Sequence, residues 1–364
     1  MKFFYILTAL FLLLPLRTFG EDYQNYGFQF FFGRQPSARS EAMGRTMVAS
    51  NDGAFTAFYN PAATYMNKGL NVAFSHGGPF YLLDNARYLF GGATYNTGKW
   101  GTVGLHYHRF SWGDELIIST AASPQGYESF KPFLQMLALN YAIEIYNGFA
   151  MGINLNWFSD HYFKKNQDSF PVDAGVFKRF QIRKTANSDQ TLNFGFNAQN
   201  IFSSNINYKA LTIGTQKLNF KEALPVILSG GASYNFSFLK QDFLPDLFVI
   251  GITLQGEYQN VLNYGYRTGY HFGSEFSLFE LFAVRLGYYS FNNRTSPESN
   301  SKKRVSDLTY GFGMNLPFNH MFRSNIPFTV SFDFTSLQQP TYITNYDNWE
   351  NFTVFSLNME WDIK

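Results

Sequence analysis

The sequence predicts an all-β fold: a transmembrane antiparallel β-barrel of about 14 strands, preceded by a small N-terminal hatch, or plug, segment. Three observations support this prediction. Polar and apolar residues alternate along segments of about ten residues, the length that a tilted membrane strand needs. The composition is rich in aromatic residues and poor in charge. After residue 20 no apolar stretch is long enough for a membrane helix, and lipid accepts only helices and closed barrels.

The composition favours a membrane wall over a soluble domain. Aromatic residues make up 20% of the chain and charged residues only 15%, against about 25% charged in a typical soluble domain. Such a bias suits a barrel with aromatic girdles at both membrane interfaces. The chain has 0 Cys, so disulfides do not hold it together, and its net charge of +2 gives no argument for a nucleic-acid partner. From composition alone, a secreted β-sandwich or adhesin domain is the alternative.

The N-terminus has the layout of a secretory signal peptide. A basic start at Met1-Lys2 is followed by an apolar run from Phe3 to Leu14, a break at Pro15 and small residues at Thr18 and Gly20. The run of about 12 residues is short of the roughly 20 that a membrane anchor helix needs. We therefore expect cleavage after residue 20, export, and a place in the outer membrane of a Gram-negative bacterium.

The mature chain divides into a hatch segment, residues 21–68, and a barrel, residues 69–364. Residues 192–199 place apolar side chains on one face and Asn, Gly or Gln on the other, and residues 328–335 repeat the pattern. One face of such a strand would meet lipid and the other a polar lumen. The predicted strands centre near Ala73, Gly92, Gly104, Asn140, Asn154, Ala174, Phe196, Gly231, Thr253, Tyr270, Leu286, Phe312, Phe332 and Leu357.

The connections between these segments differ in length. Tight turns are predicted at residues 95–99 and 146–148. Longer polar stretches lie near residues 112–128, 161–169, 203–221 and 292–307. Barrels of this class place short turns on the periplasmic side and long loops outside. The basic run at residues 301–304 is interpreted as a solvated loop tip, with lipopolysaccharide phosphate as its alternative partner.

The hatch segment carries the most specific pattern. Ala38 and Gly44 are small enough for close packing inside a barrel. Asp52 is expected to cap a short helical turn over residues 54–58. Asn60-Pro61 then ends that turn, because a residue before Pro avoids helical angles. The predicted product is a compact hatch that feeds the first strand.

This segment resembles the opening of the PorV/PorQ-like outer-membrane proteins, a branch related to FadL-type transporters. Those sequences show a Ser-Ala-Arg, then a Met-Gly, an acidic turn and an Asn-Pro-Ala. The matching hatch-motif residues here are Ser37, Ala38, Arg39, Met43, Gly44, Asp52, Asn60, Pro61 and Ala62. The resemblance implies a fourteen-stranded barrel plugged by a hatch. It also implies an accessory role in type IX secretion, with a large secretion barrel or exported cargo as partner.

The search for chemistry yields no catalytic, cofactor or metal site. His106 and His108 share a strand face, and a metal would need further ligands from the fold; we interpret them as wall or interface residues. No Gly-x-Ser-x-Gly elbow, P-loop or paired-cysteine motif is present, so we expect no enzyme. Arg285, Glu257 and Asp333 fall at inward positions, where structural pairing is the first expectation and substrate contact the second.

Two further functions compete with the secretion role. One is a FadL-like channel for hydrophobic small molecules such as long-chain fatty acids, with Phe55, Phe58 and Tyr59 lining the path or, alternatively, packing the plug. Such a channel would release its ligand sideways through the wall. The other is a structural surface barrel whose partners are outer-membrane lipid and lipopolysaccharide.

Overall fold

The structure of the chain is a computed structural model. It describes residues 26–78, 85–113, 116–120, 123–162, 165–202, 205–213, 216–241, 244–262, 267–294, 302–318, 327–339 and 350–362. The predicted signal peptide, residues 1–20, lies outside the described residues. No helix in the described ranges has the length and apolar character to cross a membrane.

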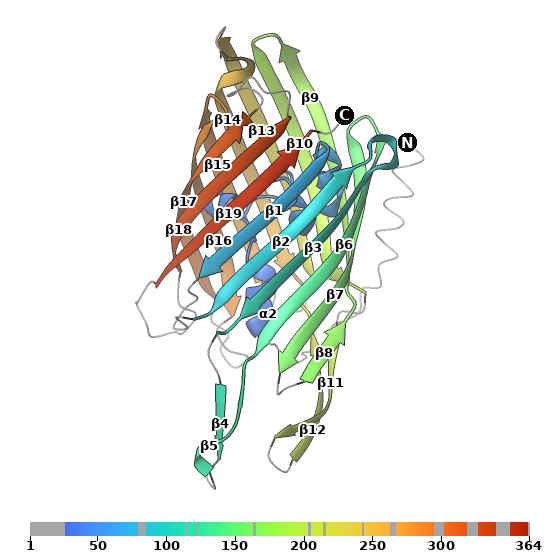
Figure 1. Cartoon of the computed structure of the whole chain (residues 1–364), viewed down its shortest axis with the longest axis vertical. Helices are drawn as coiled ribbons and strands as arrows, with labels where there is room; N and C mark the ends of the chain where they lie inside the picture. Colours follow the sequence, from blue (N-terminus) through green and yellow to red (C-terminus); the bar gives the residue numbers. More distant parts are fainter. Residues whose placement is uncertain are drawn as a thin grey trace.

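Antiparallel strands form a closed barrel in which each strand pairs with the next one around the wall (Figure 1). The strands of the ring are β1 (Leu70–Gly78), β2 (Arg87–Asn96), β3 (Thr102–Ser111), β6 (Phe133–Tyr146), β7 (Phe149–Tyr162), β9 (Val172–Thr185), β10 (Ser188–Ile201), β13 (Ile227–Gln241), β14 (Leu244–Val261), β15 (Arg267–Leu278), β16 (Phe282–Arg294), β17 (Lys302–Pro317), β18 (Phe328–Gln339) and β19 (Glu350–Trp361). The first strand also pairs with the last, Ala73 opposite Asn358, and this pairing closes the wall. The predicted fourteen-stranded barrel is confirmed, and every predicted strand centre lies within one of these strands.

The outer surface of the wall is apolar. On β16, Val284 and Leu286 are 55% and 62% exposed, whereas Arg285 between them is 3% exposed and faces the lumen. The same alternation exposes large apolar side chains around the ring, among them Phe74, Leu105, Leu139, Ile153, Phe194, Leu254, Phe272, Phe312 and Phe355. A surface of this kind needs lipid rather than water around it, so the chain has the architecture of an outer-membrane barrel.

The two ends of the barrel differ in their connections. One end carries short turns, such as Asn147-Gly148 between β6 and β7, where Gly148 adopts a left-handed φ of 74°. The 3-10 turn η2 (Gly98–Trp100) joins β2 to β3 at the same end. The C-terminal residues of β19 also lie here, with the Trp361 ring 4.5 Å from that of Phe328. This end is assigned to the periplasmic side, because barrels place their short turns there.

The long connections at the other end contain strands of their own. β4 (Leu116–Thr120) pairs with β5 (Ser123–Phe130), and β11 (Asn205–Ile213) pairs with β12 (Gln216–Ala223). β8 (Lys165–Ser169) pairs antiparallel with residues 158–162 of β7. Figure 1 shows these hairpins projecting beyond the barrel. The polar stretches predicted at residues 112–128, 161–169 and 203–221 are therefore long connections that include paired strands.

The prediction of a loop tip for the basic run was wrong in its described part. Lys302, Lys303 and Arg304 belong to β17 and pair with Arg294, Asn293 and Asn292 of β16. Antiparallel pairing carries both strands farther than the alternation of apolar residues indicated. Ser301 lies outside the described residues, and the lipopolysaccharide contact of this run stays a prediction.

The ladder between β17 and β18 is incomplete. Its pairing runs from Pro317 opposite Thr329 to Gly311 opposite Thr335, and there it ends. Beyond that point β17 continues beside β16 and β18 continues beside β19. At the division, Thr335 Oγ1 donates a hydrogen bond of 2.6 Å to the carbonyl of Tyr310. This fork, defined by Tyr310, Gly311, Thr335 and Ser336, interrupts the described wall on its long-loop side.

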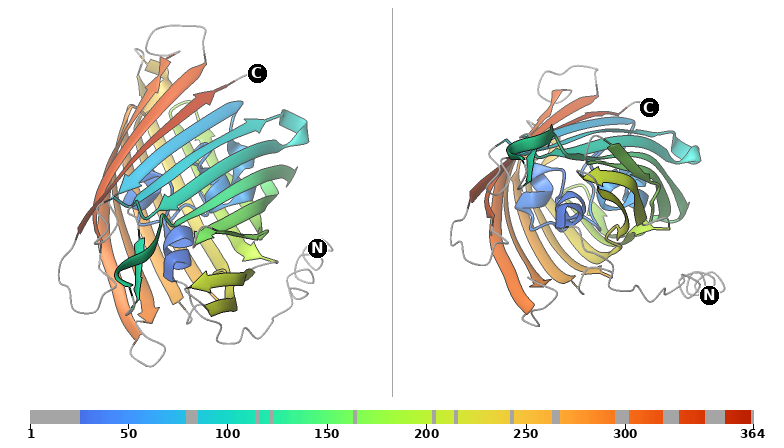
Figure 2. Two further views of the ribbon diagram at one scale, coloured as in Figure 1. Left: turned by 60° about the horizontal axis from the view of Figure 1, so that its bottom comes forward. Right: turned by 90° about the horizontal axis from the view of Figure 1, so that it is seen from below.

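The N-terminal segment folds inside the barrel as a plug (Figure 2). It contains helix α2 (Tyr26–Gly33), α3 (Ala38–Ala42), α4 (Thr56–Tyr59) and the 3-10 helix η1 (Pro61–Met66). Asn60 is extended at φ −156° and ends α4, as expected for a residue before Pro. Its side chain then accepts a hydrogen bond from the amide of Ala62 and so caps η1. The plug continues directly into β1.

The predicted cap by Asp52 was wrong. Residue Phe55 occupies the N-cap position of α4 and makes no side-chain cap. The Asp52 carboxylate instead accepts a hydrogen bond from the hydroxyl of Ser37 and lies 3.6 Å from Arg39. Long-range partners inside the barrel therefore outweigh the local capping preference of an aspartate. Ser37 is the side chain that caps a plug helix, through the amide of Ser40 at the start of α3.

Candidate functional site

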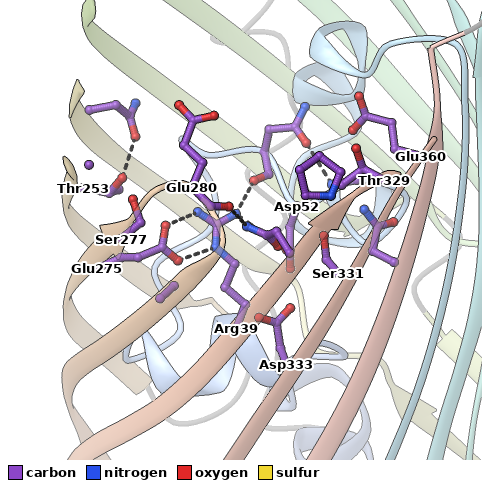
Figure 3. Close-up of a pocket in the computed structure, with 18 of the residues that line it drawn as sticks. Arg39, Asp52, Thr253, Glu275, Ser277, Glu280, Thr329, Ser331, Asp333 and Glu360 are labelled. Atoms are coloured by element: carbon purple, nitrogen blue, oxygen red, sulfur yellow. Dashed lines mark hydrogen bonds and ion pairs between the residues drawn. The ribbon is translucent and has the colours of Figure 1, made fainter. Parts of the chain in front are cut away.

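The plug is joined to the wall by a chain of buried charges. Arg39 of α3 donates two hydrogen bonds to Glu275 of β15, from Nε to Oε2 at 2.9 Å and from NH2 to Oε1 at 3.0 Å. Arg285 of β16 also donates to Glu275, and its NH1 lies 2.6 Å from Asp333 of β18. The series Asp52, Arg39, Glu275, Arg285 and Asp333 thus alternates in sign from plug to wall. Figure 3 shows the Arg39 side chain reaching Glu275.

Alternation of sign lets these charges remain inside the barrel. Burial alone would lower the pKa of Arg39, but the carboxylates of Glu275 and Asp52 outweigh it and raise that pKa above its ordinary value. A paired guanidinium of this kind stays charged, and removing one partner would leave the other buried and uncompensated. The predicted inward position and pairing of Arg285 and Asp333 are confirmed.

A second ionic cluster lies within the plug. Glu41 is fully buried and lies 2.9 Å from Arg45 and 3.5 Å from Arg34. It also accepts a hydrogen bond from the amide of Gln35 at 3.1 Å. Burial would raise the pKa of the Glu41 carboxyl, but Arg45 and Arg34 outweigh it and hold that pKa below its ordinary value. This cluster fixes the turn that joins α2 to α3.

The motif residues Ser37 and Asp52 meet the predicted path residue Tyr59 in one hydrogen-bonded group. The Tyr59 hydroxyl donates to Ser37 Oγ at 2.8 Å, and Ser37 Oγ donates to Asp52 Oδ2 at 2.5 Å. The amide of Ser37 in turn donates to the Tyr59 oxygen at 3.1 Å. Burial, with the nearby Asp52 carboxylate, raises the pKa of Tyr59 well above its ordinary value. The group fastens α3 to α4 across a separation of 22 residues.

Polar side chains of the wall bind the backbone of the plug. Asn154 of β7 donates to the carbonyl of Ala57 at 2.8 Å, and Asn197 of β10 donates to that of Tyr59 at 2.8 Å. Glu257 of β14 accepts from the amide of Val48 at 3.0 Å. Further wall-to-plug bonds come from Ser233, Gln199, His271 and Thr309. Plug carbonyls and amides are therefore satisfied by the lumen face, as burial requires.

Glycines of the wall form seats for the plug backbone. They occur as cross-strand pairs, Gly152 opposite Gly175, Gly195 opposite Gly231 and Gly273 opposite Gly287. A Cβ at Gly195 would lie 2.0 Å from the carbonyl oxygen of Val48, and one at Gly287 would lie 2.1 Å from the amide of Gly44. Real side chains do not tolerate such distances, so the plug seats only because these positions lack a Cβ.

The turn-end half of the lumen is an open polar cavity of about 640 Å³ (Figure 3). The charged chain described above lines its plug side. Thr253, Ser277, Glu280, Thr329, Ser331 and Glu360 line the rest, together with other polar residues. Water and polar solutes fit this environment, as is usual for a barrel lumen. The cavity ends at the plug, which contributes Arg39, Asn51, Asp52 and Gly53 to its lining.

The loop-end part of the lumen beside β2, β3, β6 and β7 is apolar and aromatic. Helix α2 inserts Phe28, Phe31 and Phe32 among side chains of β2, β3, β6 and β7, and none of the three is more than 3% exposed. Wall residues around them include Tyr88, Phe90, His106, His108, Phe110, Leu134, Met136 and Phe158. We call this set, with Phe55 and Phe58, the aromatic chamber. Its ring packing is close, with Phe31 5.3 Å from Phe158 and Phe55 5.0 Å from Phe90.

The predicted path residues lie at the boundary of the two halves. Phe55 and Phe58 are 1% and 2% exposed and pack in the aromatic chamber, whereas the Tyr59 hydroxyl belongs to the polar group with Ser37. In this structure they pack the plug. Met43 and Gly44 rest against Gly273 and Gly287, and Pro61 and Ala62 rest against Gly152. The hatch motif is thus brought together by the barrel, but along its wall rather than around one ligand.

Sequence reasoning missed two parts of this arrangement. One is α2: the Phe-rich run at residues 28–32 was its signal, because a solvated linker has no use for four Phe in five positions. The other is Glu275, which occupies an inward position of β15 opposite Arg285. Among the described residues, no group of three or more His, Asp or Glu is placed to hold a metal ion. His106 and His108 do share an inner face, as the alternation predicted.

Comparison with known proteins gives resemblance at the level of solved structures. The chain matches no family model and no curated protein sequence. It is similar to the CymD monoaromatic hydrocarbon channel, at 12% identity and a TM-score of 0.46, covering 90% of this chain and 97% of that one. The toluene transporter TodX of Pseudomonas putida is 9% identical, with a TM-score of 0.44, covering 90% and 98%. A FadL homologue of Pseudomonas aeruginosa is 11% identical, with a TM-score of 0.47, covering 91% and 99%.

These similarities are distant and are limited to the backbone. The relation to FadL-type proteins stays a prediction from the sequence. The finer assignment to the PorV/PorQ branch, and with it the type IX role, stays a prediction from the hatch motif.

Proposed function

We propose that this barrel conducts small hydrophobic molecules across the outer membrane, and that the plug closes the route in the resting state. The observation that carries the proposal is the aromatic chamber. Barrel lumens are ordinarily polar, yet beside β2, β3, β6 and β7 the loop-end part of this lumen is built from Phe, Tyr, Leu and Met side chains.

The chamber provides an environment that hydrophobic molecules prefer to water. Burying apolar surface is favourable by about 25 cal/mol per Å². A hydrophobic molecule arriving from the long-loop side would therefore be stabilised on replacing α2 among Phe90, Phe158 and Met136. These wall residues are 0–3% exposed, so side chains of α2 occupy the space that a ligand would take. Passage then requires that α2 or the plug below it moves.

The fork in the wall offers an exit that avoids the polar cavity. It is unfavourable for a hydrophobic molecule to enter the charged cavity beneath the plug, because the charged groups there would lose hydration. The β17–β18 ladder ends at Gly311 and Thr335, level with Ala42 of the plug, and the two strands separate from there toward the long loops. A molecule that leaves through the fork would pass directly from the chamber side of the lumen into lipid. Lateral release through this fork is part of the proposal.

Dye entry into intact bacterial cells tests the proposal. The hydrophobic dye N-phenyl-1-naphthylamine becomes fluorescent on reaching phospholipid, and lipopolysaccharide normally slows its entry. Cells that display this barrel should take up the dye several times faster than cells that display an unrelated fourteen-stranded barrel at the same level. Equal rates would contradict the proposal. If the barrel instead copurifies stoichiometrically with a large secretion barrel or exported cargo, the secretion role is favoured over the channel.

A further inference from the structure

The aromatic chamber contains polar side chains that have no polar partner. Both ring nitrogens of His106, both ring nitrogens of His108 and the hydroxyl of Tyr88 are buried, and no described residue hydrogen-bonds to any of them. The three residues are 1%, 0% and 3% exposed. Buried polar groups are nearly always paired, because leaving one unpaired sacrifices its hydration. Five such atoms on three neighbouring side chains therefore require an explanation.

The three side chains form one surface on the lumen face of β2 and β3. His106 and His108 are stacked with centroids 6.0 Å apart, and the Tyr88 ring lies 6.0 Å from that of His108. Phe90 extends the surface, 5.5 Å from His106. A metal ion is a weak explanation, since the described residues supply no third ligand.

A side chain of the plug covers this surface. Phe31 of α2 stacks on His108 at a centroid distance of 4.3 Å and an interplanar angle of 23°. It also contacts Tyr88 at 6.5 Å. A benzene ring gives good stacking but no hydrogen bond. Phe31 therefore fills the shape of the surface and leaves its donors and acceptors unused.

We propose that His106, His108 and Tyr88 are the polar end of a binding site for an uncharged aromatic molecule that carries a hydroxyl group, with Phe31 as its resident substitute. This proposal rests on the proposed function and deepens it by naming the ligand class. A neutral imidazole offers one donor and one acceptor, and a phenolic hydroxyl does the same, so the two are complementary. The ligand is uncharged because the plug charges Glu41, Arg45 and Arg34 already pair with one another.

A pair of probes isolates the hydroxyl. 4-Fluorophenol and 4-fluorotoluene have nearly the same shape, and their binding to purified barrel in detergent can be followed by ¹⁹F NMR, with empty micelles correcting for partition. In Phe31→Ala, which removes the ring stacked on His108, we expect 4-fluorophenol to bind about 5- to 30-fold more tightly than 4-fluorotoluene, the equivalent of one or two net hydrogen bonds. The wild-type barrel should show the same preference at lower affinity, because Phe31 competes.

Variants of the wall assign the preference to the three side chains. Tyr88→Phe removes only the hydroxyl, and His106→Phe with His108→Phe removes the ring nitrogens while keeping the stacking. All variants are made in the background of Phe31→Ala. The combined variant, with Tyr88→Phe, His106→Phe and His108→Phe together, should bind both probes equally. Tyr88→Phe alone should lose part of the preference for 4-fluorophenol. Heat-modifiable migration on gels checks that each barrel is folded.

The outcomes separate the two proposals. If both probes bind Phe31→Ala equally well, hydroxyl recognition is wrong, while a hydrophobic route remains supported by dye entry. If neither probe binds although dye entry is fast, the site is overturned and the channel is not. If the phenol preference persists in the combined variant, the assignment to His106, His108 and Tyr88 is wrong.

Discussion

Arg39 of the plug donates two hydrogen bonds, of 2.9 and 3.0 Å, to the carboxylate of Glu275 in the wall. The two residues are 236 positions apart, so the contact exists only in the assembled barrel. Arg285 holds Glu275 from the wall side, which leaves the carboxylate fixed between two guanidinium groups. This pair is an ionic link between the plug, which is the moving part of the proposed channel, and the wall.

Breaking this link should loosen the plug. Removing one partner of a buried ion pair costs about 3–5 kcal/mol, because the other charge is left uncompensated. We expect Arg39→Ala to increase the frequency of open events in planar-bilayer recordings. Removing both charges, in Arg39→Ala with Glu275→Gln, should restore part of the closure. If the double variant opens as often as the sum of the two single variants predicts, the pair does not act as one link.

The glycine seats give a second prediction with a matched control on adjacent strands. Gly195→Ala places a methyl group where it would lie 2.0 Å from the Val48 carbonyl, whereas a Cβ at Gly230 meets nothing closer than 3.6 Å. Overpacking costs about 1–3 kcal/mol. Gly195→Ala should raise conductance and lower the melting temperature of the barrel. Gly230→Ala should neither raise conductance nor lower the melting temperature. Similar effects for the two variants would contradict tight seating of the plug.

Acid should open the plug through Glu41. Arg45 and Arg34 hold the Glu41 pKa below its ordinary value of 4.5, so the folded plug favours the carboxylate. The stabilisation is present above the ordinary pKa and is lost as pH falls through the lowered one. Open events in planar bilayers should therefore increase as pH falls below about 4.5. Glu41→Gln should be open more often at pH 7 and show a smaller further change; an unaltered pH profile would exclude Glu41 as the responsible group.

Helix α2 should limit access to the aromatic chamber. Phe31→Ala removes a ring that is fully buried, and a Phe-to-Ala change in a core costs about 3–5 kcal/mol. The loss falls on the closed arrangement of α2, so dye entry into cells should accelerate. Phe194→Ala, on the outer face of β10 and 46% exposed, is the control and should leave dye entry unchanged. Equal acceleration by both variants would point to a general defect of the wall.

Much of the fold could be predicted from the sequence because strand alternation is a local property. Residues 192–199 show it without interruption, and all predicted strand centres lie in barrel strands. Asn60-Pro61 likewise acts through its own backbone angles. Asp52 could not be placed this way, because its partners Ser37 and Arg39 reach it only through the folded plug. The extension of β17 through Lys302 depends on pairing with β16 rather than on its own residues.

The candidate site was harder to predict because it depends on register. The sequence placed His106 and His108 on one face, but their lack of a polar partner, and the stacking of Phe31 on His108, arise from the position of α2 inside the barrel. Arg285 was expected to pair, and its partner Glu275 follows from the β15–β16 register, which the sequence alone does not supply. Seats such as Gly195 become visible only once the plug lies against them.

The most direct test of the central claim locks the plug to the wall and measures dye entry. The chain has 0 Cys, so Ala38→Cys with Ser356→Cys introduces a unique pair at a point where the Ser356 hydroxyl oxygen lies 3.1 Å from the Ala38 amide nitrogen. The two single-cysteine variants control for the substitutions themselves. We predict that the oxidised double variant admits N-phenyl-1-naphthylamine no faster than cells without the barrel, and that reduction restores entry to the rate of the single variants. Equal entry in the oxidised and reduced states, with the disulfide shown to have formed, would contradict a route that the plug controls.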